Sequence, residues 1–571
     1  MEEKNKEFKI EFNIKKKFEI ETWKILYFSL IVIIFLFTRL FKIMILPDGL
    51  HIDEVSMGYN TWSLSKFGTD RYGISFPVYF NNAGSGQSSL YVYIAVFLSK
   101  IFGYSEFILR FVAVLFGAML LIFGTLLAYE IAGMTCACAM STIITMIPYF
   151  IMSERWAFDC NAMLPMFVMS LYFFIRLLKT GKTKFAILTG IGVALTMYSY
   201  ILAFIIIPVF IIFALITAVA TKKLSLKNFL IMAGVVTLCA SPIFLYVLVI
   251  LKIIPSLKIG PINISYVSAG RLSELFWQGL SPKDILINIC NLMTYDKYEF
   301  TADKNYGVMF LNKIYLFGHG IYFIQIILWA SFFLLLGMSI YKLIKKKDSY
   351  EIYIVLYILA CLVPILFLED FAIYRFNAVF YGFAFILAYL FSILIGKKML
   401  LCALFCVIYL VGNFGSYAGY LYGSGFHEAH NPLGYFDKEF LGIFENYDKL
   451  NLGDYDSVYV DDTTTYNPGL VIQYGMKATP SDIKKYTKNM DEKEGMVYKN
   501  VHIGIPKTIN KKEKALYIIR DTKAGTSLYT NTYEQIELYK RLITIKDIKK
   551  QLEENKCKMK EINHYLLFTV Q

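Results

Sequence analysis

The chain has 571 residues, of which 57% are hydrophobic and only 18% are charged, and its mean hydropathy is +0.52. Soluble domains carry about a quarter charged residues, so this composition excludes an ordinary soluble enzyme and indicates a membrane protein. The net charge of +13 lies in short loops and a polar tail, without a basic stripe or a reading motif. It therefore predicts positive charge at a membrane face and no nucleic-acid partner.

The chain opens with a polar, basic segment, residues 1–24, which an apolar run over 25–45 follows. No small-residue cleavage site closes this run, so we interpret it as a retained anchor and 1–24 as a cytoplasmic segment. The positive-inside rule places the other lysine-rich loops on the same side, namely 176–184, 221–227, 342–348 and 396–398.

Apolar runs of roughly 18–25 residues are long enough to cross about 30 Å of hydrocarbon, and they must do so as helices. Threading them from the basic loops predicts an α-helical polytopic membrane protein that starts inside and ends outside. The transmembrane domain, 25–416, contains about eleven helices, at 25–45, 106–130, 134–152, 161–179, 184–199, 200–220, 229–252, 319–342, 350–368, 376–396 and 399–416.

Two long outer loops follow from this threading, 46–105 and 253–318. The apolar run 90–103 in the first loop is too short for a typical span, so we expect an interfacial helix on the outer face. The stretch "RYGISFPVYFNNAGSGQSSLY" (71–91) has no phosphate-loop pattern and is interpreted as a flexible loop on the acceptor side.

Residues 417–571 are polar and mix short alternating runs with charged helical stretches. The segments 456–462 and 514–521 are typical of strands, and 545–561 is typical of a helix. The sequence therefore predicts a small extracytoplasmic α/β domain at the C-terminus.

Asp53 and Glu54 stand side by side after the first span, in "LPDGLHIDEVSMGYN" (46–60). Acidic residues are common in solvated loops, and that interpretation stays open. Apolar and aromatic flanks, however, indicate a segment at the membrane surface, where partial desolvation favours proton uptake and makes a carboxylate a usable base. We therefore select both residues as candidate catalytic residues.

A third carboxylate, Asp159, lies in "SERWAFDCN" (153–161) before the fourth predicted span. It is either a helix N-terminal residue favoured by the macrodipole or a site residue, and spacing does not separate the two. In the same turn, Glu154 and Arg155 are interpreted as a local charge pair.

Two arginines are candidates for binding a phosphate, because guanidinium matches phosphate oxygens in a fork. Arg375 begins the tenth predicted span on the outer side, where a snorkelling arginine is the alternative. Arg271, in the second outer loop, is a weaker candidate of the same kind. The spacing of His427 and His430 does not support a metal site with His51.

Longer stretches carry a resemblance to a known family. Three features resemble the GT-C membrane glycosyltransferases of family 39. They are the acidic pair, the stretch "SSLYVYIAVFLSKIFGYSEFILRFVAVLFGAMLLIFGTLLAYEIAG" (88–133) and the stretch "IPYFIMSERWAFDCNAMLPMFVMSLYFF" (147–174). This family includes the protein O-mannosyltransferases and the aminoarabinose transferases. The similarity is firm over about 25–220, looser through 416 and absent in the C-terminal domain.

The resemblance implies an outward-facing site beneath interfacial helices and a sugar donor on a polyprenyl phosphate. It also implies roles for four residues: base for Asp53, acidic neighbour for Glu54, second acidic position for Asp159 and phosphate contact for Arg375. Aminoarabinose transferases have a Glu-Lys pair where this chain reads "GSGQSSLY" (84–91), so Arg375 or Arg271 is expected to take over phosphate binding. This branch is thought to need no metal, so no cofactor is predicted, and a divalent metal stays open.

Together these expectations describe a multi-pass membrane glycosyltransferase. It would move a hexosyl or pentosyl group, with inversion, from a polyprenyl-phosphate donor to an extracytoplasmic acceptor, which is a protein, a lipid or a wall glycan. One alternative is a surface-glycan polymerase or ligase that uses a lipid pyrophosphate donor. The other is a transporter of lipid-linked sugars, which the charge-poor middles of the spans argue against.

Overall fold

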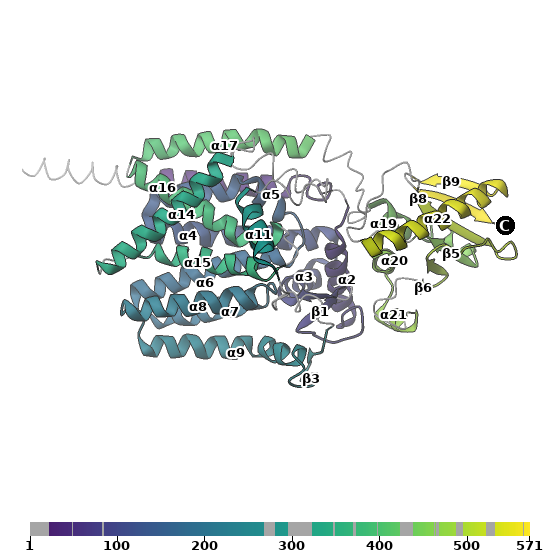
Figure 1. Ribbon diagram of the computed structural model, residues 1–571, viewed down its shortest axis with the longest axis horizontal. Coiled ribbons are helices and arrows are strands. Elements are labelled where there is room, and N and C mark those ends of the chain that lie inside the picture. The colour runs from purple at the N-terminus through teal and green to yellow at the C-terminus, as the bar shows by residue number, and fades with distance from the viewer. Residues whose placement is uncertain are drawn as a thin grey trace, which may run out of the picture.

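The protein consists of a helical bundle and a smaller C-terminal sheet domain, which lie side by side along the long axis of the molecule (Figure 1). This computed structural model describes residues 22–47, 49–82, 85–267, 280–294, 322–345, 349–368, 373–396, 398–422, 438–461, 463, 467–486, 495–520, 532–562 and 565–570.

The bundle begins with the helix Thr22–Leu40, which is apolar and mostly open to the surroundings. The longest element, α4 (Glu106–Met146), is two helices that fold back on each other at Gly133, whose φ is 80°. Only glycine adopts such a conformation without strain. A Cβ added at Gly124, in the first half, would lie 2.8 Å from the Ile144 side chain in the second half. The short helix α5 (Pro148–Ser153) leads into the buried helix α6 (Cys160–Thr180).

The remaining bundle helices follow the predicted order closely: α7 (Thr183–Met197), α8 (Ala203–Ala220), α9 (Leu226–Ile250), α14 (Tyr322–Ile344), α15 (Ile352–Leu362), α16 (Asn377–Ile395) and α17 (Met399–Tyr422). Within the described ranges, six helices are long and apolar enough to cross a membrane, and shorter apolar helices accompany them. The predicted fold class, a polytopic helical membrane protein with a C-terminal sheet domain, is confirmed.

The first outer loop is more ordered than the sequence suggested. It contains α2 (Ile52–Phe67), the antiparallel hairpin of β1 (Tyr79–Asn82) and β2 (Ser85–Ser88), and α3 (Ser89–Phe102). The interpretation of 71–91 as a flexible loop is therefore wrong. A two-residue connection closes the hairpin, and the Tyr79 ring packs over Gly86, where an added Cβ would meet it at 1.9 Å. The apolar helix α3 packs against α2 and α4.

The second outer loop touches the first. Its short hairpin of β3 (Leu257–Ile259) and β4 (Ile262–Ile264) lies next to the segment that enters β1. The backbone N–H of Val78 donates to the carbonyl of Asn263 over 3.0 Å. Further along the second loop, α11 (Pro282–Thr294) packs against α14.

The C-terminal domain is built on a mixed six-stranded sheet with the order β6-β7-β5-β8-β10-β9. Its strands are β5 (Ser457–Val460), β6 (Gly495–Tyr498), β7 (Val501–Ile503), β8 (Ala515–Arg520), β9 (Lys558–Ile562) and β10 (Tyr565–Val570), and its helices are α19 (Lys438–Glu445), α20 (Pro468–Gly475), α21 (Pro480–Tyr486) and α22 (Thr532–Glu554). The predicted strands at 456–462 and 514–521 correspond to β5 and β8. The predicted helix 545–561 is wrong beyond α22, because its last residues form β9 and pair with β10.

The helix α2 joins the two parts of the molecule, between the bundle and α20 (Figure 1). Its residues Ile52, Val55 and Tyr59 belong to the same hydrophobic cluster as Phe444 and Ile472 of the C-terminal domain. The Tyr59 hydroxyl also donates to a backbone carbonyl of that domain, at Ala478. The C-terminal domain is thus packed directly onto the helix that begins beside Asp53.

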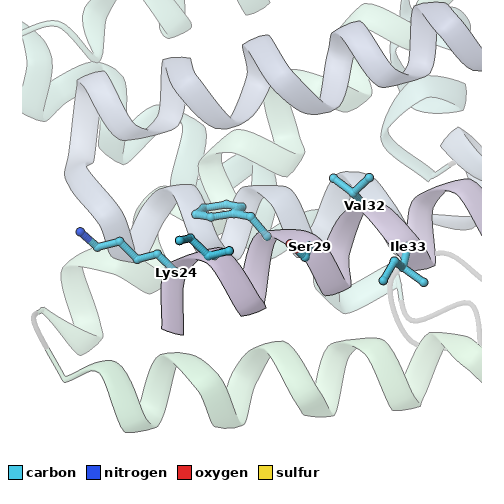
Figure 2. A pocket seen from close by; sticks show the side chains of 6 residues that line it. Lys24, Ser29, Val32 and Ile33 are labelled. Carbon is cyan, nitrogen blue, oxygen red and sulfur yellow. The ribbon is translucent and has the colours of Figure 1, made fainter. Parts of the chain in front are cut away.

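A hollow of about 620 Å³ lies against the first helix and is lined by Lys24, Ile25, Phe28, Ser29, Val32 and Ile33 (Figure 2). These residues belong to the beginning of that helix, whereas Asp53 follows its other end. The hollow is open and almost wholly apolar, as expected for a surface that faces acyl chains. It is separate from the carboxylates considered below.

Candidate active site

Asp53 lies in the first turn of α2, and its side chain is 24% exposed. Its carboxylate Oδ1 accepts a hydrogen bond of 2.8 Å from the Asn82 side-chain amide, at the end of β1. The Gln87 amide, on β2, donates to the Asp53 carbonyl over 3.4 Å. The hairpin therefore contacts Asp53 from both strands, through uncharged groups.

His51 caps α2 and orients the same turn. Its Nδ1 accepts the backbone N–H of Asp53 over 3.1 Å, so that nitrogen carries no proton in this arrangement. The 3.7 Å approach of Nδ1 to the Asp53 carboxylate is therefore not an ion pair. The imidazole packs edge-on against Phe158, with ring centroids 4.8 Å apart. Because Phe158 lies just before α6, this contact holds the start of α2 close to the start of α6.

Asp159 is the residue before α6 and is nearly buried. Its side chain does not cap the helix. Instead, its Oδ2 accepts the backbone N–H of Ser88 over 2.9 Å. Because Asn82 and Ser88 belong to one hairpin, the two aspartates are held by the same small element.

Glu54 has a different environment from its neighbour. It is fully buried, and both of its oxygens accept from Arg110, at 3.1 Å from Nε and 3.2 Å from Nη2. The same oxygens also accept the backbone N–H groups of His51 and Ala157, over 2.9 and 3.0 Å. This set of partners describes a structural ion pair that pins α2 to α4 and to the turn before α6.

The neighbouring turn contains a second buried ion pair, and the predicted local pairing of Glu154 with Arg155 is wrong. Glu154 pairs with Arg39 of the first helix at 2.7 Å. Arg155 instead donates to the backbone carbonyls of Thr38, Arg39, Phe41 and Leu46. These bonds satisfy carbonyls at the end of the first helix, where no further helical turn donates N–H groups to them.

Arg375 lies in the 3₁₀ turn Ile373–Phe376 at the start of α16 and is half-buried. Two residues later, the Asn377 amide donates to the Cys160 carbonyl at the start of α6 over 3.1 Å. Arg375 and Asp159 therefore flank one helix-to-helix contact. Arg271 lies outside the described residues.

The described residues contain no group of three or more His, Cys, Asp and Glu side chains that could hold a metal ion. Asp53 and Asp159 are two carboxylates near one element, without a third ligand in the described part of the chain. No chemical step below depends on a divalent metal. His427 and His430 lie outside the described ranges.

Sequence reasoning missed the residues that join the carboxylates: Asn82, Gln87, Ser88 and Arg110. The local signal for the hairpin was present, since two short runs flank an Ala-Gly connection in "YFNNAGSGQS" (79–88). The pairing of Arg110 with Glu54 spans 56 residues and left no local signal.

The arrangement can move a proton and position a hydroxyl group. Asp53 is partly exposed and its Oδ1 accepts from the neutral Asn82 amide, an environment that suits a carboxylate to accept a proton. Asp159, which the same hairpin contacts, can orient a polar group nearby. Arg375 supplies positive charge on the same side of the bundle.

Residues 87–246 match the family model "Dolichyl-phosphate-mannose-protein mannosyltransferase". The crystal structure of ArnT from Cupriavidus metallidurans in the apo state is similar with a TM-score of 0.53 and 8% identity, over 97% of this chain and 98% of that chain. The structure of that protein bound to undecaprenyl phosphate matches with a TM-score of 0.53 and 10% identity, over 96% and 98%. No curated protein matches the chain.

The structural likeness covers nearly the whole length of both chains and therefore includes the C-terminal domain. It shows that the chain has the GT-C fold, and with the family match it confirms the resemblance to GT-C glycosyltransferases of family 39.

Proposed function

We propose that the protein is a membrane glycosyltransferase that takes a sugar from a polyprenyl-phosphate carrier and gives it to an acceptor outside the cytoplasm. The observation that carries the proposal is that one hairpin joins Asp53 and Asp159 at the start of α2 and α6. The family match over 87–246 and the GT-C fold support the reaction class. Undecaprenyl phosphate in the ArnT structure supports a lipid phosphate as the leaving group.

In the proposed reaction, Asp53 accepts the proton of the acceptor hydroxyl as its oxygen forms a bond to the anomeric carbon. The bond from that carbon to the phosphate oxygen breaks, and the electron pair leaves with the polyprenyl phosphate. Attack opposite the leaving group inverts the anomeric carbon. A positioned base contributes about 10²–10⁴-fold to such a rate, and Arg375 stabilises the negative charge of the leaving phosphate.

Glu54 has another role in this proposal. Since both of its oxygens are bonded to Arg110 and to backbone N–H groups, it positions the turn that carries Asp53 and does not touch substrate. The C-terminal domain and the hairpin lie on the extracytoplasmic side, and residues 1–24 lie in the cytoplasm.

Purified protein in lipid nanodiscs tests the reaction. It is given a polyprenyl-phosphate sugar or the corresponding polyprenyl-pyrophosphate sugar, with hydroxyl acceptors, and the release of the lipid carrier is measured. We expect release from the monophosphate donor and an inverted product. Release from the pyrophosphate donor alone would favour a glycan polymerase or ligase and contradict the proposal.

A further inference from the structure

Arg71, in the turn after α2, is a buried arginine that makes no hydrogen bond to a carboxylate in the described part of the chain. It is 2% exposed. Its Nη2 donates to the Asn81 carbonyl over 3.2 Å, while Nε and Nη1 donate to no described atom. The Tyr72 ring lies 4.7 Å from the guanidinium carbon, which stabilises a cation only partly.

The other fully buried arginines of the bundle provide the comparison. Arg39, Arg110 and Arg155 donate from every guanidinium nitrogen to a carboxylate, a hydroxyl or a backbone carbonyl. Burying a charge without such partners costs several kcal/mol. Among the fully buried arginines in the described part of the bundle, Arg71 is therefore the exception, because two of its guanidinium nitrogens lack a partner, and the exception points to a ligand.

Neutral donors line the helix beside Arg71. The Asn60 carbonyl oxygen accepts the Arg71 backbone N–H over 3.3 Å, and the Asn60 amide nitrogen has no described partner. The Ser56 hydroxyl is also buried without a described partner. Ser56 and Asn60 are one turn apart on the α2 face that carries Asp53, because residues 3, 4 and 7 positions apart share a helix face.

The cluster is close to the proposed catalytic base. Asn81, which accepts from the Arg71 guanidinium, precedes Asn82, which donates to Asp53. Asp53 and Asn60 are about 10 Å apart along the helix axis, a separation that a sugar and its phosphate can bridge.

Asp70, the nearest carboxyl in sequence, makes no hydrogen bond to Arg71, although the guanidinium charge opposes the rise of the Asp70 pKa. Its Oδ1 accepts the backbone N–H groups of Tyr72 and Ile74 over 2.9 and 2.8 Å, inside its own turn.

We propose that Arg71, Ser56 and Asn60 form an oxyanion subsite that binds a phosphate group of the substrate. Guanidinium, amide and hydroxyl donors are the groups that recognise phosphate oxygens. The proposal rests on the proposed function for the source of that phosphate, which is either the lipid carrier of the donor or a phosphate on the acceptor. Arg71 would then act beside Arg375, and no role in proton transfer is assigned to it.

Binding assays without turnover test this subsite. Full-length protein in detergent is titrated with undecaprenyl phosphate, with a soluble sugar 1-phosphate and with inorganic phosphate, and affinity is measured from the shift of the thermal midpoint. Arg71→Gln removes the charge and keeps an amide donor. Arg176→Gln is the matched control, because Arg176 is partly exposed, pairs with Glu130 and lies near the end of α6 that is opposite Asp159.

We expect Arg71→Gln to weaken binding of at least one phosphate ligand tenfold or more, while Arg176→Gln leaves all three affinities unchanged. A loss that includes undecaprenyl phosphate or the sugar 1-phosphate, which are the two parts of the donor, identifies the donor as the source, and a loss confined to inorganic phosphate identifies the acceptor. Unchanged affinity for all three would overturn the subsite and leave Arg71 bonded to buried water only.

If Arg71→Gln does not fold, Ser56→Ala and Asn60→Ala each remove one neutral donor, and the same ligands are then expected to bind about 3–10-fold more weakly. Unchanged affinities in both would overturn the subsite. Because these measurements need no sugar transfer, wild-type protein that binds phosphate without transferring any sugar would contradict the proposed function and not the subsite.

Discussion

Asp53 and Glu54 are adjacent in the chain but lie in two contrasting regions. On the Glu54 side, buried arginines meet carboxylates directly, in the pairs Arg110–Glu54 and Arg39–Glu154. On the Asp53 side, the hairpin offers only neutral donors. Both regions lie at one end of the bundle, and both contact the segment that enters α2.

This difference distinguishes carboxylates that stabilise the fold from a carboxylate that can accept a proton in catalysis. A carboxylate bonded to a buried guanidinium is stabilised in its ionised form and has little capacity left for a substrate. A partly exposed carboxylate that neutral donors hold keeps its orientation and can still accept a proton. We therefore expect substitutions in the arginine region to reduce folding, and substitutions in the hairpin region to reduce turnover.

The largest effect is expected at the arginine region. Arg110→Leu leaves Glu54 buried without its partner, and removal of one member of a buried pair costs about 3–5 kcal/mol. We expect little folded protein in size-exclusion chromatography and a much lower thermal midpoint. Arg176→Leu serves as control. It breaks a partly exposed pair with Glu130, which keeps Lys179 as a partner, and should cost under about 1 kcal/mol. Equal losses in the two variants would contradict the distinction.

The hairpin region should respond through turnover. Asn82→Leu removes the donor to Asp53 Oδ1 at similar volume. A hydrogen bond to a charged group contributes about 1.5–3 kcal/mol, so kcat should fall about 10–100-fold while KM for the donor and the thermal midpoint change little. The control is Asn81→Leu, one residue earlier and on the opposite face of the strand. A kcat in Asn82→Leu equal to that of the control would show that Asn82 does not act through Asp53.

A substitution that disrupts the contact between α2 and the C-terminal domain is expected to have a smaller effect on stability. A Cβ at Gly58 would lie 2.6 Å from the Tyr104 hydroxyl, whose partner at 2.6 Å is the Tyr474 hydroxyl of the C-terminal domain. Gly58→Leu should therefore destabilise the junction by about 1–3 kcal/mol and speed proteolytic release of the domain. Gly234→Leu, at a helix glycine with open space around it, should leave the release rate unchanged. An unchanged rate in Gly58→Leu would argue against a fixed junction.

The smallest effect concerns pH. Burial raises the pKa of Asp70 from its ordinary 3.8 to about 6, against the opposing effects of its backbone hydrogen bonds and of Arg71. The raised pKa favours the protonated carboxyl in the folded state, so its contribution to stability is complete below about pH 3.8 and is lost as pH rises through 6.

Asp70→Asn keeps the acceptor for the backbone N–H groups of Tyr72 and Ile74 and removes the titration. It should stabilise the protein above pH 6, by on the order of 1 kcal/mol, and change nothing near pH 4, as thermal unfolding across pH would show. A stabilisation that is the same at both pH values would contradict the assignment.

Much of the fold could be predicted from the sequence, because long apolar runs have one solution in a membrane. Local features that depend on few residues were harder to predict from the sequence. The hairpin of β1 and β2 is made of two four-residue strands, too short for periodicity to distinguish them from a loop. The strand β9 was lost for a similar reason, since "KMKEI" (558–562) continues a charged, helix-like stretch.

The candidate site was predicted in part. Asp53, Asp159 and Arg375 came from position and from the resemblance, and their catalytic roles stay predictions. The environments of the carboxylates could not be read from the sequence, because the partners are remote. Arg110 lies 56 residues after Glu54, and Arg39 lies 115 residues before Glu154. Adjacent residues such as Glu154 and Arg155 therefore seemed to be a pair although each has other partners.

Parallel assays of Asp53→Asn and Glu54→Gln test the contrast between these neighbouring carboxylates most directly. Both variants and the surface control Asp448→Asn are assayed for thermal midpoint and for sugar transfer in the same nanodiscs. We predict that turnover of Asp53→Asn falls at least 100-fold while its thermal midpoint stays normal. For Glu54→Gln we predict that the thermal midpoint falls and that any loss of transfer accompanies this loss of stability. Full transfer by Asp53→Asn, or a normal midpoint with abolished transfer in Glu54→Gln, would contradict the account.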